Sequence, residues 1–411
     1  MPATTSAIMS QVPEFADYFV ELYKEFHQHP ELSMQETWTV ERIEQELKSY
    51  GLEATRVGGT GTVTMIENGD GPTIGFRADT DGLPMVEKTG VDWASTVTTS
   101  DADGNKVGVM HGCGHDTHIT CALLLAKLMH ENRDAWAGTL IIIFQPGEEI
   151  GAGANAMVED GLWEKFPKPE AIFGQHIWPG LADEVTLSHG TAMSMADSLK
   201  VTVHGKQAHG SQPENAIDPI VLGAHMVTRL QTVVSREVAG SDMVVLTVGT
   251  FNAGTKENII PQTATFKLNI RTQDEAVRER VLEAVDRILK GEAVASGAPE
   301  PTVEPMYRFP RCDNDVQLAK DLEQSFRESL GEDKVNISGP ATGSEDFGIL
   351  GDSIDVPYVF WFWGAYSDAK YKGPGSVAGN HSPFFVTDVP EQSLTTGIKV
   401  GLTAVLSRLG K

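Results

Sequence analysis

The sequence has 411 residues, 40% of them hydrophobic, which is enough for one large core or two smaller ones. Its 32 Lys and Arg against 57 Asp and Glu give a formal net charge of −25, which argues against a nucleic-acid-binding protein, because such proteins carry clustered positive charge. Three cysteines, no apolar run of about twenty residues and no signal-peptide-like start predict a cytoplasmic protein that does not enter membranes.

The first part of the chain predicts an α/β domain. Apolar residues recur at spacings of three and four in several segments, which is the pattern of amphipathic helices. One segment, TLIIIFQ, is apolar on both faces, as a central strand covered by helices on both sides must be. Expected strands and helices alternate along this part of the chain, which favours a mostly parallel sheet with helices on both faces. The expected helices are 14–29, 37–50 and 115–132, and the expected strands are 61–67, 72–79, 139–145 and 171–176.

After about residue 187 the pattern changes. Strands and helices follow in β-α-β-β-α-β order, which is the order of ferredoxin-like domains. We therefore predict an inserted α+β domain over 189–305 and a discontinuous main domain over 1–188 and 306–411. The expected strands of the insert are 198–205, 243–251, 264–272 and one near Thr302, and its expected helices are 216–236 and 274–295. The main domain resumes with helices over 315–330 and 390–409 and a buried strand over 356–364.

Residues suited to metal binding cluster after the expected strands. The stretch MHGCGHDTH, residues 110–118, holds three histidines, a cysteine and an aspartate, and leads into a helix. Two aspartates, a Glu-Glu pair and a histidine each follow a strand, and ligands gather at the carboxyl ends of parallel strands. Four of these residues have side chains that bind Zn²⁺, Mn²⁺ or Co²⁺: Cys113, His115, Glu149 and His176.

Glu148 is then a spare carboxylate beside a ligand. A metal-assisted hydrolase needs a base that takes a proton from water and passes it to the leaving nitrogen. Adjacent glutamates after a strand can divide these jobs, with Glu149 on the metal and Glu148 on the water. A Glu-Glu pair is usually a solvated surface, but this pair follows an apolar strand and Pro-Gly, which favours a site.

The other histidines are expected to have supporting roles. A histidine that binds a metal needs a partner on its second ring nitrogen, and Asp116 is a candidate for that partner. We expect His111 and His118 to be structural or to support the ligands. His27 and His29 are expected to cap carbonyl groups at a helix end.

A thiol hydrolase is the alternative reading of the same stretch. Cys113 would be the nucleophile and His115 or His118 the base. This hypothesis leaves both glutamates and His176 without a function. Chelation should distinguish a thiol hydrolase, which would stay active, from a metal-dependent one. Cys121, on the apolar side of a helix, is expected to be buried, and Cys312 has no assigned role.

Seven motifs resemble those of the peptidase M20 family, subfamily D, and occur in the same order; the resemblance runs from about residue 20 to residue 405. They are RADTDGLP, MHGCGHDTH, QPGEE, GKQAHGSQP, NIIP, GSEDFG and NHSPF. That subfamily includes hippurate hydrolases, auxin-conjugate hydrolases and bacterial N-acyl amino acid amidohydrolases. The resemblance implies that the insert is a lid and dimerisation domain. It leaves the acyl specificity open, because the Gly-rich segment 365–380 differs.

The resemblance also implies roles for individual residues. One or two divalent ions would be held by Cys113, His115, Glu149, His176 and His381, with Cys113 as the bridge. Glu148 matches the general base, and Asp79 matches the aspartate that orients the ligands. His209 matches a histidine that stabilises the oxyanion in a neighbouring subunit, and Asn258 and Arg271 match residues that hold the substrate carboxylate. Reasoning from the residues alone does not find His381, His209, Asn258 or Arg271.

We therefore expect a homodimeric, metal-dependent amidohydrolase that cleaves the amide bond of N-acyl amino acids. Since the surface is acidic, Arg271 would provide local positive charge for an anionic substrate. An exopeptidase acting on dipeptides is the alternative within the family, but no acidic group for the substrate ammonium is evident. A non-catalytic binding protein on the same fold is the remaining alternative. Such proteins usually lose a ligand or the base, and here every one is present.

Overall fold

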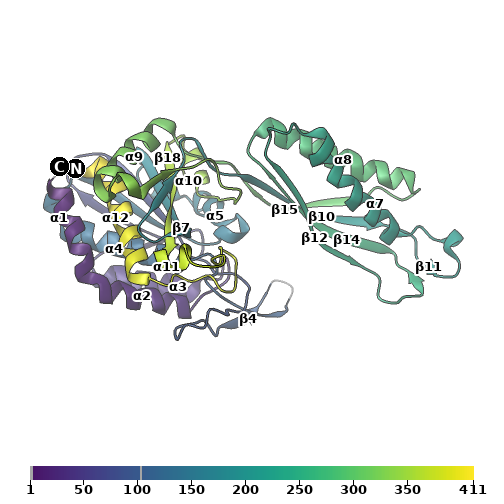
Figure 1. Cartoon of the computed structure of the whole chain (residues 1–411), viewed down its shortest axis with the longest axis horizontal. Helices are drawn as coiled ribbons and strands as arrows, with labels where there is room; N and C mark the ends of the chain where they lie inside the picture. Colours follow the sequence, from purple (N-terminus) through teal and green to yellow (C-terminus); the bar gives the residue numbers. More distant parts are fainter. Residues whose placement is uncertain (1–2, 102–103) are drawn as a thin grey trace. The chain divides into compact units, whose positions relative to one another are not determined.

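The structure is a computed structural model that describes residues 3–101 and 104–411. The chain divides into two compact units (Figure 1). The large unit comprises Met1–Ala192, Cys312–Pro340 and Asp346–Lys411, and the small unit comprises Met193–Arg311 and Ala341–Glu345. Among the described residues, no helix combines the length and the apolar character that crossing a bilayer requires.

The large unit is built on an eight-stranded sheet with the strand order β1-β2-β6-β3-β7-β18-β8-β17. The four central strands, β6, β3, β7 and β18, pair in parallel, and β1, β2 and β8 join antiparallel. This confirms the expected α/β class with a mostly parallel sheet. The strands are β1 Thr55–Val57, β2 Gly61–Asn68, β3 Thr73–Asp79, β6 Gly138–Gln145, β7 Ala171–Leu181, β8 Val185–Leu187, β17 Val335–Ile337 and β18 Tyr358–Tyr366.

Helices cover both faces of this sheet. On β6, Leu140, Ile142 and Phe144 belong to the core formed with α4 and α12, while Ile141 and Ile143 are equally buried on the other face. Helix α5 contacts β6, and α10 contacts β7 and α5. The apolar character of both faces thus has the expected cause. The helices are α1 Ala3–Gln11, α2 Ala16–Gln28, α3 Thr37–Ser49, α4 His115–Glu131, α5 Gly153–Glu159, α6 Leu162–Lys165, α9 Val316–Leu330, α10 Gly348–Asp352, α11 Asp368–Tyr371 and α12 Pro390–Leu409.

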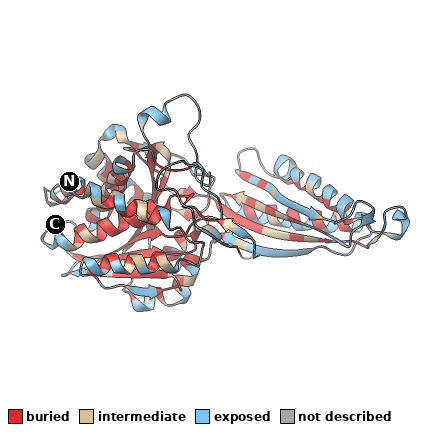
Figure 2. Ribbon diagram, turned by 90° about the horizontal axis from the view of Figure 1, so that it is seen from below, coloured by how far each residue is buried: buried red, intermediate tan, exposed pale blue. Residues whose placement is uncertain are grey.

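The small unit has a four-stranded antiparallel sheet with the order β12-β14-β10-β15 and two long helices, α7 and α8. Numbered within the unit, this order is 2-3-1-4, the arrangement of a ferredoxin-like β-α-β-β-α-β unit. Buried residues lie between the helices and the sheet (Figure 2). The elements are β10 Met195–His204, α7 Pro219–Thr232, β12 Val244–Ala253, β14 Thr263–Thr272, α8 Glu275–Ala295 and β15 Thr302–Phe309.

Several expected boundaries differ from the structure, and two of these differences have a clear physical cause. Helix α7 begins at Pro219 rather than near residue 216, because the Asp218 side chain caps it by accepting from the Ile220 backbone N–H at 2.8 Å. Strand β7 does not end at His176. It continues to Leu181, because β18 pairs alongside it from Ile172 to Trp178 and again at Leu181.

Several short elements were not expected from the sequence. A hairpin forms where polar and apolar residues show no clear period, and other pairs are too short to leave a pattern. The strands that pair in separate two-stranded sheets are β4 Thr98–Ser100, β5 Lys106–Gly108, β9 Thr191–Met193, β11 Ala208–His209, β13 Ile259–Ile260 and β16 Cys312–Asp313.

Candidate metal centre

The proposed ligands come from separate segments of the large unit. Cys113 lies in the loop before α4, and His115 is the first residue of that helix. Between them Gly114 has φ +87°, and a Cβ there would lie 2.4 Å from Ile177, so both the backbone angle and the space require glycine. Glu149 lies in a 3₁₀ turn directly after β6, and His176 lies on β7.

These side chains converge. Cys113 Sγ lies 3.3 Å from His176 Nε2, and Glu149 Oε2 lies 3.2 Å from His381 Nε2. The other oxygen of Glu149 lies 3.9 Å from His115 Nε2. Ligand atoms of Cys113, Glu149 and His381 all fall within 4.8 Å of one another, as do those of His115, Glu148 and Glu149. The structure therefore brings all five proposed ligands and Glu148 into one connected group.

The hydrogen bonds leave lone pairs directed at this group. His176 Nδ1 donates to the Ile177 carbonyl oxygen at 2.6 Å, so its Nε2 carries the lone pair. His115 Nδ1 pairs with Asp81 Oδ1 at 3.2 Å, which leaves His115 Nε2 available. Within the described residues, His115 Nε2 and Glu149 Oε1 are buried and have no hydrogen-bond partner. Unpartnered buried atoms of this kind fit a divalent cation.

The electrostatics point the same way. Burial lowers the pKa of His115, but Asp79, Asp81 and Glu149 together raise it to about 10. Burial raises the pKa of the Cys113 thiol well above its usual range, and Glu149 and Glu148 raise it further. Both shifts reflect an excess of negative charge in a buried space. A cation would neutralise this charge and favour the thiolate and the neutral imidazole, which are the forms that bind metals.

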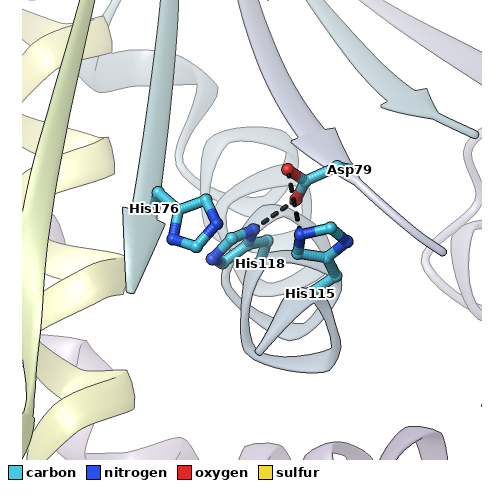
Figure 3. Close-up of side chains that lie close together, drawn as sticks. All are labelled: Asp79, His115, His118 and His176. Atoms are coloured by element: carbon cyan, nitrogen blue, oxygen red, sulfur yellow. Dashed lines mark hydrogen bonds and ion pairs between the residues drawn. The ribbon is translucent and has the colours of Figure 1, made fainter. Parts of the chain in front are cut away.

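Asp79 lies beside His115, His118 and His176, and it interacts with His115 and His118 (Figure 3). It accepts hydrogen bonds from His118 Nδ1 and, at 2.7 Å, from Arg77 Nη1, and it lies 3.6 Å from His115 Nε2. His118 Nε2 accepts from the Ile177 backbone N–H at 2.9 Å. Both nitrogens of His118 are therefore engaged. These contacts fit the expected supporting role and leave neither ring nitrogen free to act as the base of a thiol mechanism.

A buried network fixes Asp79 in turn. Arg77 Nε donates to Gln145 Oε1 at 2.9 Å, and Arg77 Nη2 lies 3.3 Å from Asp346 Oδ1. Asp346 also accepts from Gln145 Nε2 at 2.7 Å and from the Ala154 backbone N–H at 3.1 Å. No role was predicted for Arg77 or for Asp346 of the GSEDFG motif. Side chains alternate between the two faces of β3, so Arg77 and Asp79 lie on the same face. This alternation is the sequence signal that could have linked Arg77 to Asp79.

The expected partner of the ligand histidine was wrong. Asp81, not Asp116, is the partner of His115, and its other oxygen accepts from the Glu149 backbone N–H at 3.0 Å. Asp116 instead pairs with His27 Nδ1 at 2.6 Å, while His27 Nε2 lies 3.0 Å from Glu87. Burial lowers the pKa of His27, but these two carboxylates raise it to about 9.

His27 is therefore a buried ion-pair residue and does not cap a helix. Its spacing from Phe19, Tyr23 and Phe26 places it on the buried stripe of α2, which the sequence could have shown. His29, as expected, contacts the Glu25 carbonyl oxygen, at 2.8 Å. Three further residues are buried: Cys121, as expected, His111 and Cys312.

The three remaining predicted residues lie in the small unit. His209 is exposed in β11, with Nδ1 2.7 Å from Ser211 Oγ, and Asn258 is also exposed. Arg271, on β14, donates to Asn269 Oδ1 at 3.0 Å and to Ser344 Oγ at 2.9 Å. These partners are uncharged, and the described residues include no ion pair of Arg271 with a carboxylate.

Comparison with known proteins identifies related sequences along most of the chain. The model of "Peptidase family M20/M25/M40" matches residues 75–407. Hippurate hydrolase of Campylobacter jejuni is 35% identical over 86% of this chain and 90% of its own. N-acetyl-L-cysteine deacetylase of Bacillus subtilis is 33% identical over 85% of this chain and 81% of its own.

A solved structure has the same fold. It is the Bacillus subtilis YXEP protein, described as a dinuclear metal binding peptidase from the M20 family. Its sequence is 28% identical, the TM-score is 0.73, and the match covers 96% of this chain and 98% of that one.

Proposed function

Because the chain belongs to peptidase family M20/M25/M40 and is a hydrolase of that family, we propose that it cleaves the amide bond of N-acyl amino acids. The products are a carboxylic acid and a free amino acid. The observation that carries the proposal is the group of five ligand side chains with Glu148 beside them, in a space that is buried except at the His381 side chain. Three free cysteines support the cytoplasm as the place of action.

Cys113, His115, Glu149, His176 and His381 would hold one or two divalent ions, Zn²⁺, Mn²⁺ or Co²⁺. When bound, such ions polarise the amide carbonyl and lower the pKa of water. Glu148 is only 5% exposed and has a carboxylate oxygen within 4.8 Å of the ligand atoms of His115 and Glu149. As the general base, Glu148 takes a proton from the attacking water and hands it to the departing nitrogen.

Asp79 and Asp81 position these groups. Asp81 holds the ring of His115 through Nδ1 and the Glu149 backbone through its N–H. Asp79 orients His118, whose Nε2 accepts a hydrogen bond from the backbone N–H of Ile177, the residue after His176. Such partners fix the tautomer and the angle of a ligand ring.

The small unit would supply substrate binding. Arg271 and Asn258 hold the α-carboxylate of the substrate, and His209 stabilises the oxyanion that forms as the amide is attacked. The absence of an ion-pair partner for Arg271 in the described part of the chain supports this role. A guanidinium whose hydrogen-bond partners are uncharged can attract an anion locally on a chain whose net charge is −25.

We further propose a homodimer formed through the small unit. Strand β12 is an edge of its sheet, and edge strands present unpaired backbone groups. Helix α7 contacts β12. Both elements expose large apolar side chains, which a two-fold contact would cover: Ile220, Val221, Val245 and Phe251.

The alternatives have less support. A thiol hydrolase needs a thiolate, whereas burial and two glutamates keep the pKa of Cys113 high. A non-catalytic protein has no need of Glu148 beside a complete ligand set. A dipeptidase would need an acidic group for the substrate ammonium, and the proposed substrate residues are Arg271, Asn258 and His209.

A substrate panel tests this proposal. Hippurate, N-acetyl amino acids and dipeptides are assayed with each metal in turn, together with hippurate whose carboxylate is converted to an amide. We expect kcat/KM to be about 10- to 100-fold lower for the capped compound, because it loses charge-assisted hydrogen bonds. Replacing Arg271 with alanine should abolish this discrimination. Equal cleavage of the capped compound would refute the carboxylate anchor, and a preference for dipeptides would favour the exopeptidase.

A further inference from the structure

Asn380 connects three segments of the large unit that carry proposed ligands. It directly precedes His381 in the loop before α12. Its side-chain Nδ2 donates to the Cys113 carbonyl oxygen at 3.0 Å and to the Ile177 carbonyl oxygen at 3.2 Å. Ile177 follows His176, so one amide group contacts the backbone of two ligand segments and belongs to the third.

The backbone of His381 is in an uncommon conformation. Gly379 to Ser382 form a turn, closed by a hydrogen bond from the Ser382 N–H to the Gly379 carbonyl oxygen at 3.1 Å. His381 is the third residue of this turn and has φ +64°, in the left-handed region. This conformation is unfavourable for a residue other than glycine. It persists only where the surroundings enforce it, and such positions concentrate at functional sites.

Hydrogen bonds to the Cys113 and His176 segments enforce this backbone conformation of His381. Besides the two bonds of Asn380, the His381 backbone N–H donates to the Gly112 carbonyl oxygen at 2.8 Å. The His381 ring itself is weakly held, since its side chain is 55% exposed and its Nε2 pairs with Glu149 at 3.2 Å. The direction of the ring is therefore set by the backbone of the turn.

We infer that Asn380 is a positioning residue that places His381 against the segments of Cys113 and His176, so that the ligand set is formed before a cation arrives. This inference rests on the proposed metal site. Without the two side-chain bonds, the turn can relax to an unstrained conformation that directs the ring elsewhere. Binding a cation would then require the turn to be rebuilt, and this cost lowers the metal affinity.

The test is metal binding by the Asn380→Ala variant. Metal-free wild-type and variant proteins are titrated calorimetrically with Mn²⁺, Co²⁺ and Zn²⁺, and circular dichroism checks the fold. We expect the affinity to fall about 10- to 100-fold, the usual effect of removing a partner behind a metal ligand. An affinity within twofold of wild type would overturn the inference. Asn380→Leu, which keeps the size but lacks the donor, provides the same measurement if the alanine variant does not fold.

Asn68 offers a matched control. Its side-chain Nδ2 also donates to two backbone carbonyl oxygens, those of Arg133 at 2.6 Å and Trp136 at 2.7 Å. It pairs with Gly138 at the start of β6, at the opposite end of that strand from Glu149. Asn68→Ala should lower the melting temperature without changing the metal affinity. Equal loss of metal in both variants would show a general effect of destabilisation and overturn the inference.

A second comparison asks whether Asn380 acts through His381. In a His381→Ala background, Asn380→Ala should cause no further loss of metal affinity, because the ring that it places is gone. A further loss of metal affinity as large as in the wild type would refute the claim that Asn380 acts through His381. If wild-type protein itself binds none of the three metals, the proposed function fails. If wild type binds and Asn380→Ala binds equally well, only this inference fails.

Discussion

Replacing Glu148 with glutamine should reduce kcat at least about a thousandfold and leave the metal content unchanged, because the amide keeps the size of the side chain but cannot accept a proton. Glu148 is buried beside the ligand atoms of His115 and Glu149, so the variant changes the base without opening the site. The measurements are kcat on hippurate at saturating metal and the metal content of the purified protein.

Glu149→Gln is the matched control, since it makes the same change one residue away. Glu149 has one oxygen 3.2 Å from His381 and the other 3.9 Å from His115, so this variant should lose metal. Near-normal turnover in Glu148→Gln would remove Glu148 from the mechanism. Equal loss of metal in both variants would show that the two glutamates do not divide the work as proposed.

Mixing two inactive variants should restore activity if His209 serves the site of a partner subunit. His209→Ala and Glu148→Gln proteins are dissociated together and allowed to reassociate. A mixed dimer then carries one site with both defects and one site with neither. Random assortment makes about half of the dimers mixed, so up to roughly a quarter of wild-type activity should return.

The same mixture distinguishes the opposite arrangement. If His209 served its own subunit, every site would keep one defect and no activity would appear. A mixture of two portions of the same variant provides the baseline. A fully active protein that sediments as a monomer would also end the dimer proposal.

Much of the large unit could be predicted because the patterns that reveal its strands and helices lie within short stretches of sequence. The two apolar faces of β6 follow from helices on both sides, and the sequence shows both faces directly. The position of the site follows from the rule that ligands gather at the carboxyl ends of parallel strands. Glu148 and Glu149 come directly after β6, where that rule places them.

The partners of the ligands could not be predicted, because they depend on direction and on distant segments. Asp116 is next to His115 in sequence, but consecutive residues on a helix point about 100° apart. Asp116 therefore faces His27 of α2, while Asp81 reaches His115 from the end of another strand. His381 lies in an aperiodic turn, so only the family resemblance pointed to it.

The most direct test of metal-dependent hydrolysis follows activity and Cys113 together as metal is removed and returned. We expect chelation to abolish hippurate cleavage and Mn²⁺, Co²⁺ or Zn²⁺ to restore it. Mass spectrometry should find Cys113 alkylated by iodoacetamide in the metal-free protein and protected in the loaded one, because the thiol is then a ligand. Cleavage that survives chelation and is lost only when Cys113 is alkylated would contradict the account and establish a thiol enzyme.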